Sequence, residues 1–181
     1  TYTVQNLERL GVSAVVIEDK KGLKKNSLFG TDVKQEQDSI ENFCEKIKVG
    51  INSKQTDEFM VIARIESLIL GKGIEDALLR GRSYADSGAN GVLIHSKDKS
   101  EELVFLFVEN FKKDFDVPVI VVPTTYNHIT LDEFKKLGVD IVIYANHLLR
   151  SAYPAMLNTA EEILKFGRTQ ELEKKLMSVK E

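Results

Sequence analysis

The chain has 181 residues, of which 43% are hydrophobic and 29% are charged, and its formal net charge is −3 at pH 7. A single cysteine, Cys44, excludes an internal disulfide, and no apolar run reaches the ~20 residues that span a bilayer. Because the lysines are scattered and the net charge is small, the sequence suggests neither a nucleic-acid-binding stripe nor a polybasic membrane patch. We therefore expect one cytoplasmic domain over residues 1–181, with no nucleic-acid or membrane partner.

Short apolar runs alternate with amphipathic stretches from the first residues onward. A helix predicted over 4–10 leads into the first strand. The predicted strands are 13–19, 59–67, 91–96, 117–124 and 139–147. The predicted helices between and after them are 38–48, 74–87, 101–115, 131–137 and 149–166, with a charged final helix over 169–181. The strands are rich in Val and Ile with little polar alternation, which is typical of a parallel sheet buried on both faces.

The order α-(βα)5-α predicts an α/β fold. The junctions LGVSAV, SGANGVL and LGVDIV each place a glycine before a strand, where it can end the preceding helix in the left-handed conformation. Five strands suit either an open doubly wound sheet or part of a (βα)8 TIM-like barrel. The absence of a G-x-G-x-x-G after any strand favours the barrel. A barrel normally needs ~250 residues, so we expect about five βα units plus terminal helices, with the upstream strands absent.

Polar side chains gather where the predicted strands end, which also favours a barrel. They are Glu18 and Asp19, Arg64 and Glu66, His95 and Ser96, Thr124 and Thr125, and Asn146 and His147. Barrel active sites are built at this carboxyl face from several strands at once. Glu18 and Asp19 either begin a loop or hold a hard cation such as Mg²⁺. Arg64, inside an apolar strand, either pairs with Glu66 or forms a fork for a carboxylate or phosphoryl group.

Other candidate residues have simpler interpretations when taken singly. His95 alone is more typical of a satisfied core histidine than of a ligand, and His128 is typical of a solvated surface. Cys44 falls on the apolar face of a helix, which indicates packing. The lysine-rich run 20–25 is either solvated or a mobile cationic loop suited to closing over an anion. Taken together with the strand ends, this loop favours an anionic, metal-chelated substrate.

Five segments resemble, in order and spacing, the phosphoenolpyruvate mutase family of the isocitrate lyase superfamily. They are GVSAVVIEDKKGLKKNSL, FMVIARIES, GVLIHSK, VIVVPTTY and IVIYANHLLR. The resemblance implies an α/β barrel, a homo-oligomer with a swapped terminal helix, and Mg²⁺ as the cofactor. It also implies the interconversion of phosphoenolpyruvate and phosphonopyruvate, two small anionic substrates, with formation of a carbon–phosphorus bond.

The resemblance also implies roles for three strand-end residues. Glu18 is similar to the acidic residue that helps to hold the Mg²⁺ hydration shell. Arg64 and His95 match the catalytic residues that bind the substrate's phosphoryl group. The family's upstream strands carry further metal and carboxylate-binding residues that have no counterpart in these 181 residues. We therefore expect the chain to be the carboxyl-terminal part of a longer enzyme, inactive and prone to self-association when isolated.

The cationic loop separates this chain from some relatives of that superfamily. Lys24 and Asn26 match the family's catalytic loop lysine and asparagine, and Ser27 and Leu28 complete the substrate-binding K-x-N-S-L pattern. The superfamily's lyases carry a catalytic cysteine there, which this loop lacks, so carbon–carbon lyase activity is not expected. Phosphonopyruvate hydrolase carries a threonine near the position of Asn26. Two alternatives to a mutase stay open: that hydrolase, and a non-catalytic oligomerising remnant of the fold.

Overall fold

The structure is a computed structural model that describes residues 1–22 and 35–179. It divides into two compact units, Thr1–Ile143 and Tyr144–Glu181, and each is described by itself below. The expectation of one domain over 1–181 stays a prediction. None of the helices within the described ranges is long and apolar enough to cross a membrane.

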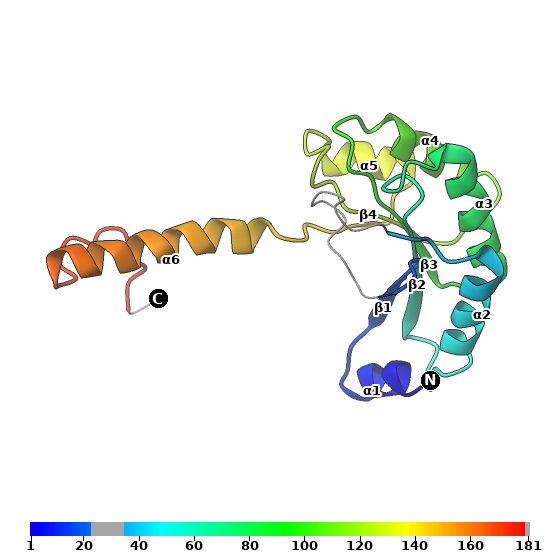
Figure 1. Ribbon diagram of the computed structural model, residues 1–181, viewed down its shortest axis with the longest axis horizontal. Coiled ribbons are helices and arrows are strands. Elements are labelled where there is room, and N and C mark those ends of the chain that lie inside the picture. Colours follow the sequence, from blue (N-terminus) through cyan, green and yellow to red (C-terminus); the bar gives the residue numbers. More distant parts are fainter. Residues whose placement is uncertain (23–34, 180–181) are drawn as a thin grey trace. The chain divides into compact units, whose positions relative to one another are not determined.

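The described part of the first unit is built on five parallel strands that follow one another in the sheet in chain order (Figure 1). The strands are β1 (Ala14–Glu18), β2 (Met60–Ile65), β3 (Gly91–Ile94), β4 (Val119–Val121) and β5 (Ile141–Val142). Every neighbouring pair is parallel. The prediction of a parallel α/β sheet is therefore confirmed.

Five helices accompany these strands within the described residues 1–22 and 35–143. They are α1 (Tyr2–Arg9), α2 (Ile40–Ile51), α3 (Gly73–Asp86), α4 (Glu102–Phe111) and α5 (Leu131–Leu137). Ser39 begins α2 by accepting a hydrogen bond from the backbone N–H of Asn42, and Thr130 begins α5 through a capping box with Glu133. The glycines of the three predicted junctions, Gly11, Gly88 and Gly138, have φ values of 76°, 94° and 96°. Their left-handed conformation confirms the predicted helix ends.

The helices α2 to α5 lie along the same side of the sheet (Figure 1). Alternate strand residues such as Ala63 and Ile65 point to that side and join the large core cluster, together with Phe43 of α2 and Phe107 of α4. The opposite face carries a small cluster that, among the described residues, comes from the strands and their immediate ends. A sheet with sequential strand order and helices on one side is wound in a single sense. It is therefore a segment of the barrel arrangement and not a doubly wound sheet.

The last predicted strand and the last predicted helix are corrected by the structure. The strand predicted over 139–147 contains only Ile141–Val142, because its pairing with β4 ends at the bond from the N–H of Ile143 to the carbonyl of Val121. The helix predicted over 169–181 is absent from the described part of that range, residues 169–179. Short-range bonds hold turns there instead, such as that from the N–H of Lys175 to the carbonyl of Leu172.

The second unit consists of α6 (His147–Phe166) and the turns that follow it. The helix begins two residues before the predicted start and ends at Gly167, which has a φ of 61°. Within the described turns, residues 167–179, Leu172 is buried at 1% exposure, and Lys175 forms an ion pair with Glu162 of the helix. No residue of α6 itself is buried. The helix therefore presents its large apolar side chains to its surroundings.

Candidate active site

Three strand ends bring Glu18, Arg64 and His95 to one side of the sheet. Glu18, the last residue of β1, is the register partner of Arg64 in β2. Arg64 in turn is the partner of Leu93 in β3, and His95 lies two residues farther along. Because side chains alternate along a strand, Leu93 and His95 point to the same side as Arg64. The predicted placement of these residues at one carboxyl edge is confirmed.

Four charged side chains form a closed ring of ion pairs at this edge. The Arg64 Nη1 lies 3.1 Å from Glu18 Oε1, and its Nε donates to Glu66 Oε1 at 2.5 Å. The Lys20 Nζ lies 2.8 Å from Glu66 Oε2 and 3.6 Å from Glu18 Oε2. All four side chains are at most 17% exposed, so this ring, here called the ion-pair ring, is largely shielded from water. Two carboxylates hold the guanidinium of Arg64 in a fixed orientation.

The charges of the ion-pair ring lower the pKa of Glu66, and burial together with Arg64 lowers the pKa of the neighbouring His95. Burial alone would raise the pKa of Glu66, but the charge of Arg64 and the bond from Lys20 outweigh it, so the pKa of Glu66 is lowered. Burial, and after it the positive charge of Arg64, lower the pKa of His95 to about 4. His95 is therefore neutral at pH 7, and its imidazole can donate one hydrogen bond and accept another.

The imidazole of His95 is buried with a polar atom left over. Its side chain is 4% exposed, and its Nδ1 has no hydrogen-bond partner among the described residues. Buried polar atoms are nearly always paired in folded proteins, so an unpaired one indicates a ligand, a water or an ion. The unpaired Nδ1 of His95 thus indicates a binding site at this edge.

Glu18 and Asp19 do not act as a pair, because the strand turns them to opposite sides. Asp19 is fully buried on the helix side, where its Oδ2 accepts hydrogen bonds from Tyr84 and Gln37, both at 2.7 Å. Burial raises the pKa of Asp19, although the bonds from these two residues act in the opposite direction. Of the two acidic residues, Glu18 alone faces the ion-pair ring.

A magnesium site is not complete in the described part of the chain. Among residues 1–22 and 35–179 there is no group of three or more His, Cys, Asp or Glu side chains placed to hold a metal ion. Glu18 supplies one carboxylate, and that carboxylate contacts Arg64 and Lys20. Since Mg²⁺ prefers octahedral oxygen coordination, these residues by themselves do not fit it.

The predicted loop residues Lys24, Asn26, Ser27 and Leu28 lie outside the described residues. The residues that flank them are described.

Lys20, predicted only as part of a cationic run, joins the ion-pair ring and is 8% exposed. Its position directly after the strand end at Glu18 and Asp19 was the sequence signal that could have identified it. Glu66 likewise does more than pair with Arg64, since it bridges Arg64 and Lys20.

The remaining strand-end and single-residue predictions have mixed outcomes. Thr124 lies three residues beyond β4, whereas Asn146 belongs to the second unit, so its predicted place at this edge stays a prediction. Cys44 packs against the main core, as predicted. His128 is exposed, as predicted, and its Nε2 lies 3.0 Å from Glu101 Oε2.

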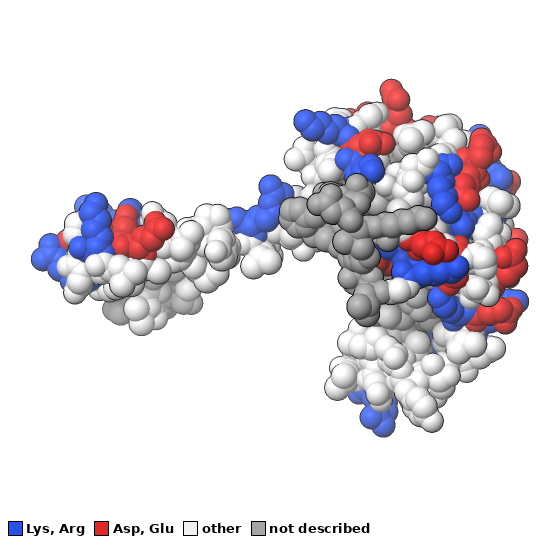
Figure 2. Space-filling view, viewed as in Figure 1, with Lys and Arg blue, Asp and Glu red and all other residues white. Residues whose placement is uncertain are grey.

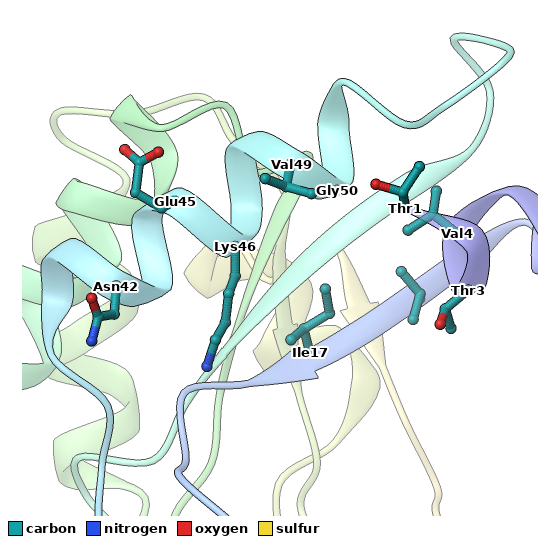
Figure 3. Close-up of a pocket in the computed structure, with 10 residues that line it drawn as sticks. Thr1, Thr3, Val4, Ile17, Asn42, Glu45, Lys46, Val49 and Gly50 are labelled. Atoms are coloured by element: carbon teal, nitrogen blue, oxygen red, sulfur yellow. The ribbon is translucent and has the colours of Figure 1, made fainter.

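A cavity of about 530 Å³ lies on the helix side of β1, away from the ion-pair ring. Figure 3 shows Ile17 of β1, Val4 of α1 and Val49 of α2 among its lining residues. Ile17 points to the side opposite Glu18, because the two are consecutive residues of one strand. The cavity and the ion-pair ring are therefore separate features.

Acidic and basic side chains are interspersed over the visible face of the first unit (Figure 2). No broad field of one sign is visible there.

Comparisons with known proteins agree with this geometry. The family model described as "Phosphoenolpyruvate phosphomutase" matches residues 1–164. The phosphoenolpyruvate phosphomutase of Tetrahymena pyriformis is 39% identical over 178 residues, which are 98% of this chain and 58% of that protein. The phosphonopyruvate hydrolase of Variovorax sp. (strain Pal2) is also 39% identical, over 181 residues that cover 99% of this chain and 61% of the relative. Sequence identity therefore does not separate the two activities.

Solved structures of both kinds of enzyme also match nearly the whole chain. The crystal structure of phosphoenolpyruvate phosphomutase from Streptomyces platensis subsp. rosaceus matches with a TM-score of 0.93 and 41% identity, over 99% of this chain and 61% of that one. A phosphonopyruvate hydrolase in complex with oxalate and Mg²⁺ matches with a TM-score of 0.87 and 36% identity, over 99% and 60% of the two chains. The chain thus spans about three fifths of the length of these four relatives. By its sequence pattern and its fold, it belongs to the phosphoenolpyruvate phosphomutase family.

Proposed function

We propose that the protein to which this chain belongs is a phosphoenolpyruvate phosphomutase, which interconverts phosphoenolpyruvate and phosphonopyruvate. The observation that carries the proposal is the buried His95 beside Arg64, with its Nδ1 unpaired among the described residues. A phosphoryl group offers the acceptor oxygens that both side chains can bind. The family membership of the chain supports the same reaction class.

In this proposal Arg64 and His95 bind the phosphoryl group while it changes partners. In the direction of phosphonopyruvate, the P–O bond to the enolate oxygen breaks and a C–P bond to the neighbouring carbon forms. The phosphoryl group passes through a loose state with charge spread over its three oxygens, so directed N–H donors stabilise it. Glu18 and Glu66 orient the guanidinium of Arg64 for this task. Lys24, Asn26, Ser27 and Leu28 are proposed as further contacts from the loop.

Phosphonopyruvate hydrolase is the second candidate, because a hydrolase and a mutase are equally identical to this chain. The two reactions share the phosphoryl site and differ in what receives the phosphoryl group: the enolate oxygen or water. We propose that Asn26 favours the enolate oxygen. Replacement of Asn26 by Ala is then expected to lower kcat of the mutase reaction by a larger factor than it raises KM.

We propose Mg²⁺ as the cofactor, with Glu18 in contact with its hydration shell. The hydrolase structure solved with oxalate and Mg²⁺ supports this choice, and so does the carboxylate of Glu18 at the strand edge. When bound, the metal would stabilise the negative charge of the pyruvate enolate. Its direct ligands would come from outside the described residues.

We also propose a homo-oligomer in which α6 packs against a second copy of the protein, in a cytoplasmic location. One side of α6 carries a continuous apolar stripe. Its members are Leu149, Tyr153, Met156, Leu157, Ile163 and Leu164, each between 38% and 85% exposed. An exposed stripe of this kind is typical of a helix that is covered by a partner.

The test of the proposed function follows the fate of phosphorus in the complete protein. Phosphonopyruvate and Mg²⁺ are added and the products are followed by ³¹P NMR. A mutase converts the phosphonate signal into that of phosphoenolpyruvate. A hydrolase yields inorganic phosphate and pyruvate instead, and the absence of any turnover would favour the non-catalytic remnant.

A further inference from the structure

Asp19 is the hub of a buried polar network on the helix side of the sheet, directly behind the ion-pair ring. Its carboxylate accepts four hydrogen bonds. The donors are Gln37 Nε2 at 2.7 Å, Tyr84 Oη at 2.7 Å, the Glu66 backbone N at 3.0 Å and Arg80 Nη1 at 3.3 Å. The side chain is fully buried. Such a saturated carboxylate fixes the groups around it, because each departure would leave a buried donor unpaired.

The network reaches the ion-pair ring through Glu66. The backbone N–H of Glu66 donates to Asp19, while the side chain of Glu66 bridges Arg64 and Lys20. The backbone N–H of Asp19 in turn donates to the carbonyl of Arg64 at 3.1 Å. The position of the guanidinium is therefore coupled to a carboxylate that lies on the other side of the strand.

The same hub fixes both described ends of the connection between β1 and α2. The carbonyl of Asp19 accepts from the N–H of Asp38 at 2.8 Å, and the Arg80 Nη1 donates to the carbonyl of Asp38 at 2.9 Å. Lys20 and Gln37 form an antiparallel bridge just inside these ends. The described residues 19–20 and 37–38 are thus held against each other, next to the ion-pair ring.

Tyr84 and Arg80 hold the hub from α3. The Arg80 Nη1 also donates to the Tyr84 hydroxyl at 2.8 Å, and its Nε donates to Asp76 at 3.0 Å. Burial and the charge of Asp19 raise the pKa of Tyr84, so its hydroxyl stays protonated and donates to that carboxylate. Both oxygens of the Asp19 carboxylate therefore accept hydrogen bonds from buried donors.

We propose that Asp19 is a positioning residue for the phosphoryl site, with Tyr84 and Arg80 as its supports. It acts through Glu66 on Arg64, and through Lys20 on the opposite side of the ring. The inference rests on the proposed function for its effect on the reaction, but its physical content is the coupling of the helix-side network to the ring. Misplacement of a reacting group by about 1 Å can cost ~100-fold in rate.

The main test compares two buried tyrosines in the complete protein. Tyr84→Phe removes one hydroxyl from the network, and Tyr126→Phe removes the same atom from a fully buried tyrosine outside it. We expect Tyr84→Phe to lower kcat for phosphonopyruvate roughly tenfold or more, with a smaller change in KM, because the positioning of a transition-state contact is lost. Tyr126→Phe should leave kcat within about twofold of wild type. Equal kcat values for the two variants would overturn the inference while leaving the proposed function intact.

A second readout needs no turnover. Hydrogen exchange of the Glu66 and Asp38 amides is measured in both variants, with the Val92 amide, which bonds Pro118 in the sheet, as an internal reference. Tyr84→Phe should speed exchange at Glu66 and leave Val92 unchanged. If the wild type turns over no phosphonopyruvate, the proposed function fails, and hydrogen exchange alone then tests whether the Asp19 network is coupled to the ion-pair ring. Unchanged exchange of the Glu66 amide in Tyr84→Phe would refute this coupling. Asp19→Asn perturbs the bond between the Glu66 amide and Asp19 more strongly.

Discussion

Arg64 and Glu18 stand opposite each other in neighbouring parallel strands, and their side chains meet at 3.1 Å between Nη1 and Oε1. The two residues are 46 positions apart in sequence, yet the register of β1 and β2 makes them partners. A carboxylate that contacts a guanidinium and faces the substrate edge can influence both the anion and a nearby cation. The proposed roles of Glu18 and Arg64 are therefore coupled.

Glu18→Gln should weaken the dependence of activity on magnesium. If Glu18 contacts the hydration shell of Mg²⁺, the neutral amide should raise the Mg²⁺ concentration for half-maximal activity about tenfold. Glu45→Gln, at an exposed glutamate of α2 that pairs with Lys48, is the matched control. The measurement is a magnesium titration of phosphonopyruvate turnover at saturating substrate. Identical titration curves for the two variants would remove Glu18 from the metal site.

The buried imidazole of His95 should make the protein less stable in acid. Its pKa is lowered to about 4 in the folded state, against an ordinary value of 6.5. The unfolded chain therefore binds the proton first, and stability that is fully present above pH 6.5 is lost as the pH falls toward 4. The expected loss is about 3 kcal/mol. Urea unfolding at several pH values should show it.

Carboxyl groups also titrate in this pH range, so a variant is needed to isolate the contribution of His95. His95→Asn should unfold with a shallower pH dependence than wild type between pH 6.5 and 4. Parallel curves for the two proteins would show that His95 is protonated without cost in the folded state.

Two glycines on helices should respond oppositely to alanine. A Cβ at Gly81 of α3 would meet the Phe107 ring at 2.9 Å, and that ring is fully buried and stacked on Phe111. Gly81→Ala should therefore cost ~1–3 kcal/mol through overpacking. At Gly50 of α2 the nearest atom, a Val61 methyl, lies at 3.4 Å, so alanine should be neutral or stabilise by up to ~1 kcal/mol. Urea denaturation measures both, and equal effects would contradict the packing of α3 on α4.

The apolar stripe of α6 should be required for assembly. Leu157→Lys places a charge within the stripe and should lower the molar mass of the complete protein measured by size-exclusion chromatography with light scattering, because an unpaired charge is costly in an apolar interface. Asn158→Lys adds the same charge one residue later, on the opposite side of the helix. The proposal of a helix-mediated oligomer would be wrong if both variants kept the wild-type mass.

Much of the fold could be predicted because its signals are local. The Val and Ile runs and the glycines at 11, 88 and 138 identify parallel strands and helix ends by themselves. The length of the last strand was predicted wrongly, because it depends on how far the strand pairs with its neighbour in the sheet. β5 is two residues long because it pairs with β4 over only that length, and nothing in the run 139–147 records how far a partner extends. The predicted helix over 169–181 has few apolar residues to bury, and its first residues form turns.

The placement of three candidate site residues at one strand edge was predicted from the sequence, whereas most of their surroundings were not. Glu18, Arg64 and His95 were identified from their places at strand ends and from the family resemblance. The separation of Glu18 from Asp19 could have been derived from strand alternation. The participation of Lys20 and the network of Asp19 with Tyr84 depend on contacts between distant segments, which a single sequence does not display.

The most direct test of the proposed phosphoryl site is to replace Arg64 in the complete protein and to measure the turnover of phosphonopyruvate. Arg64→Lys keeps the charge but removes the planar fork, and should lower kcat/KM at least ~100-fold. Arg82→Lys, at a half-exposed arginine of α3 that pairs with Asp114, should leave kcat/KM within about twofold of wild type. If Arg64 binds the phosphoryl group, a large loss of kcat/KM is expected in Arg64→Lys alone. Wild-type kcat/KM in Arg64→Lys would contradict it.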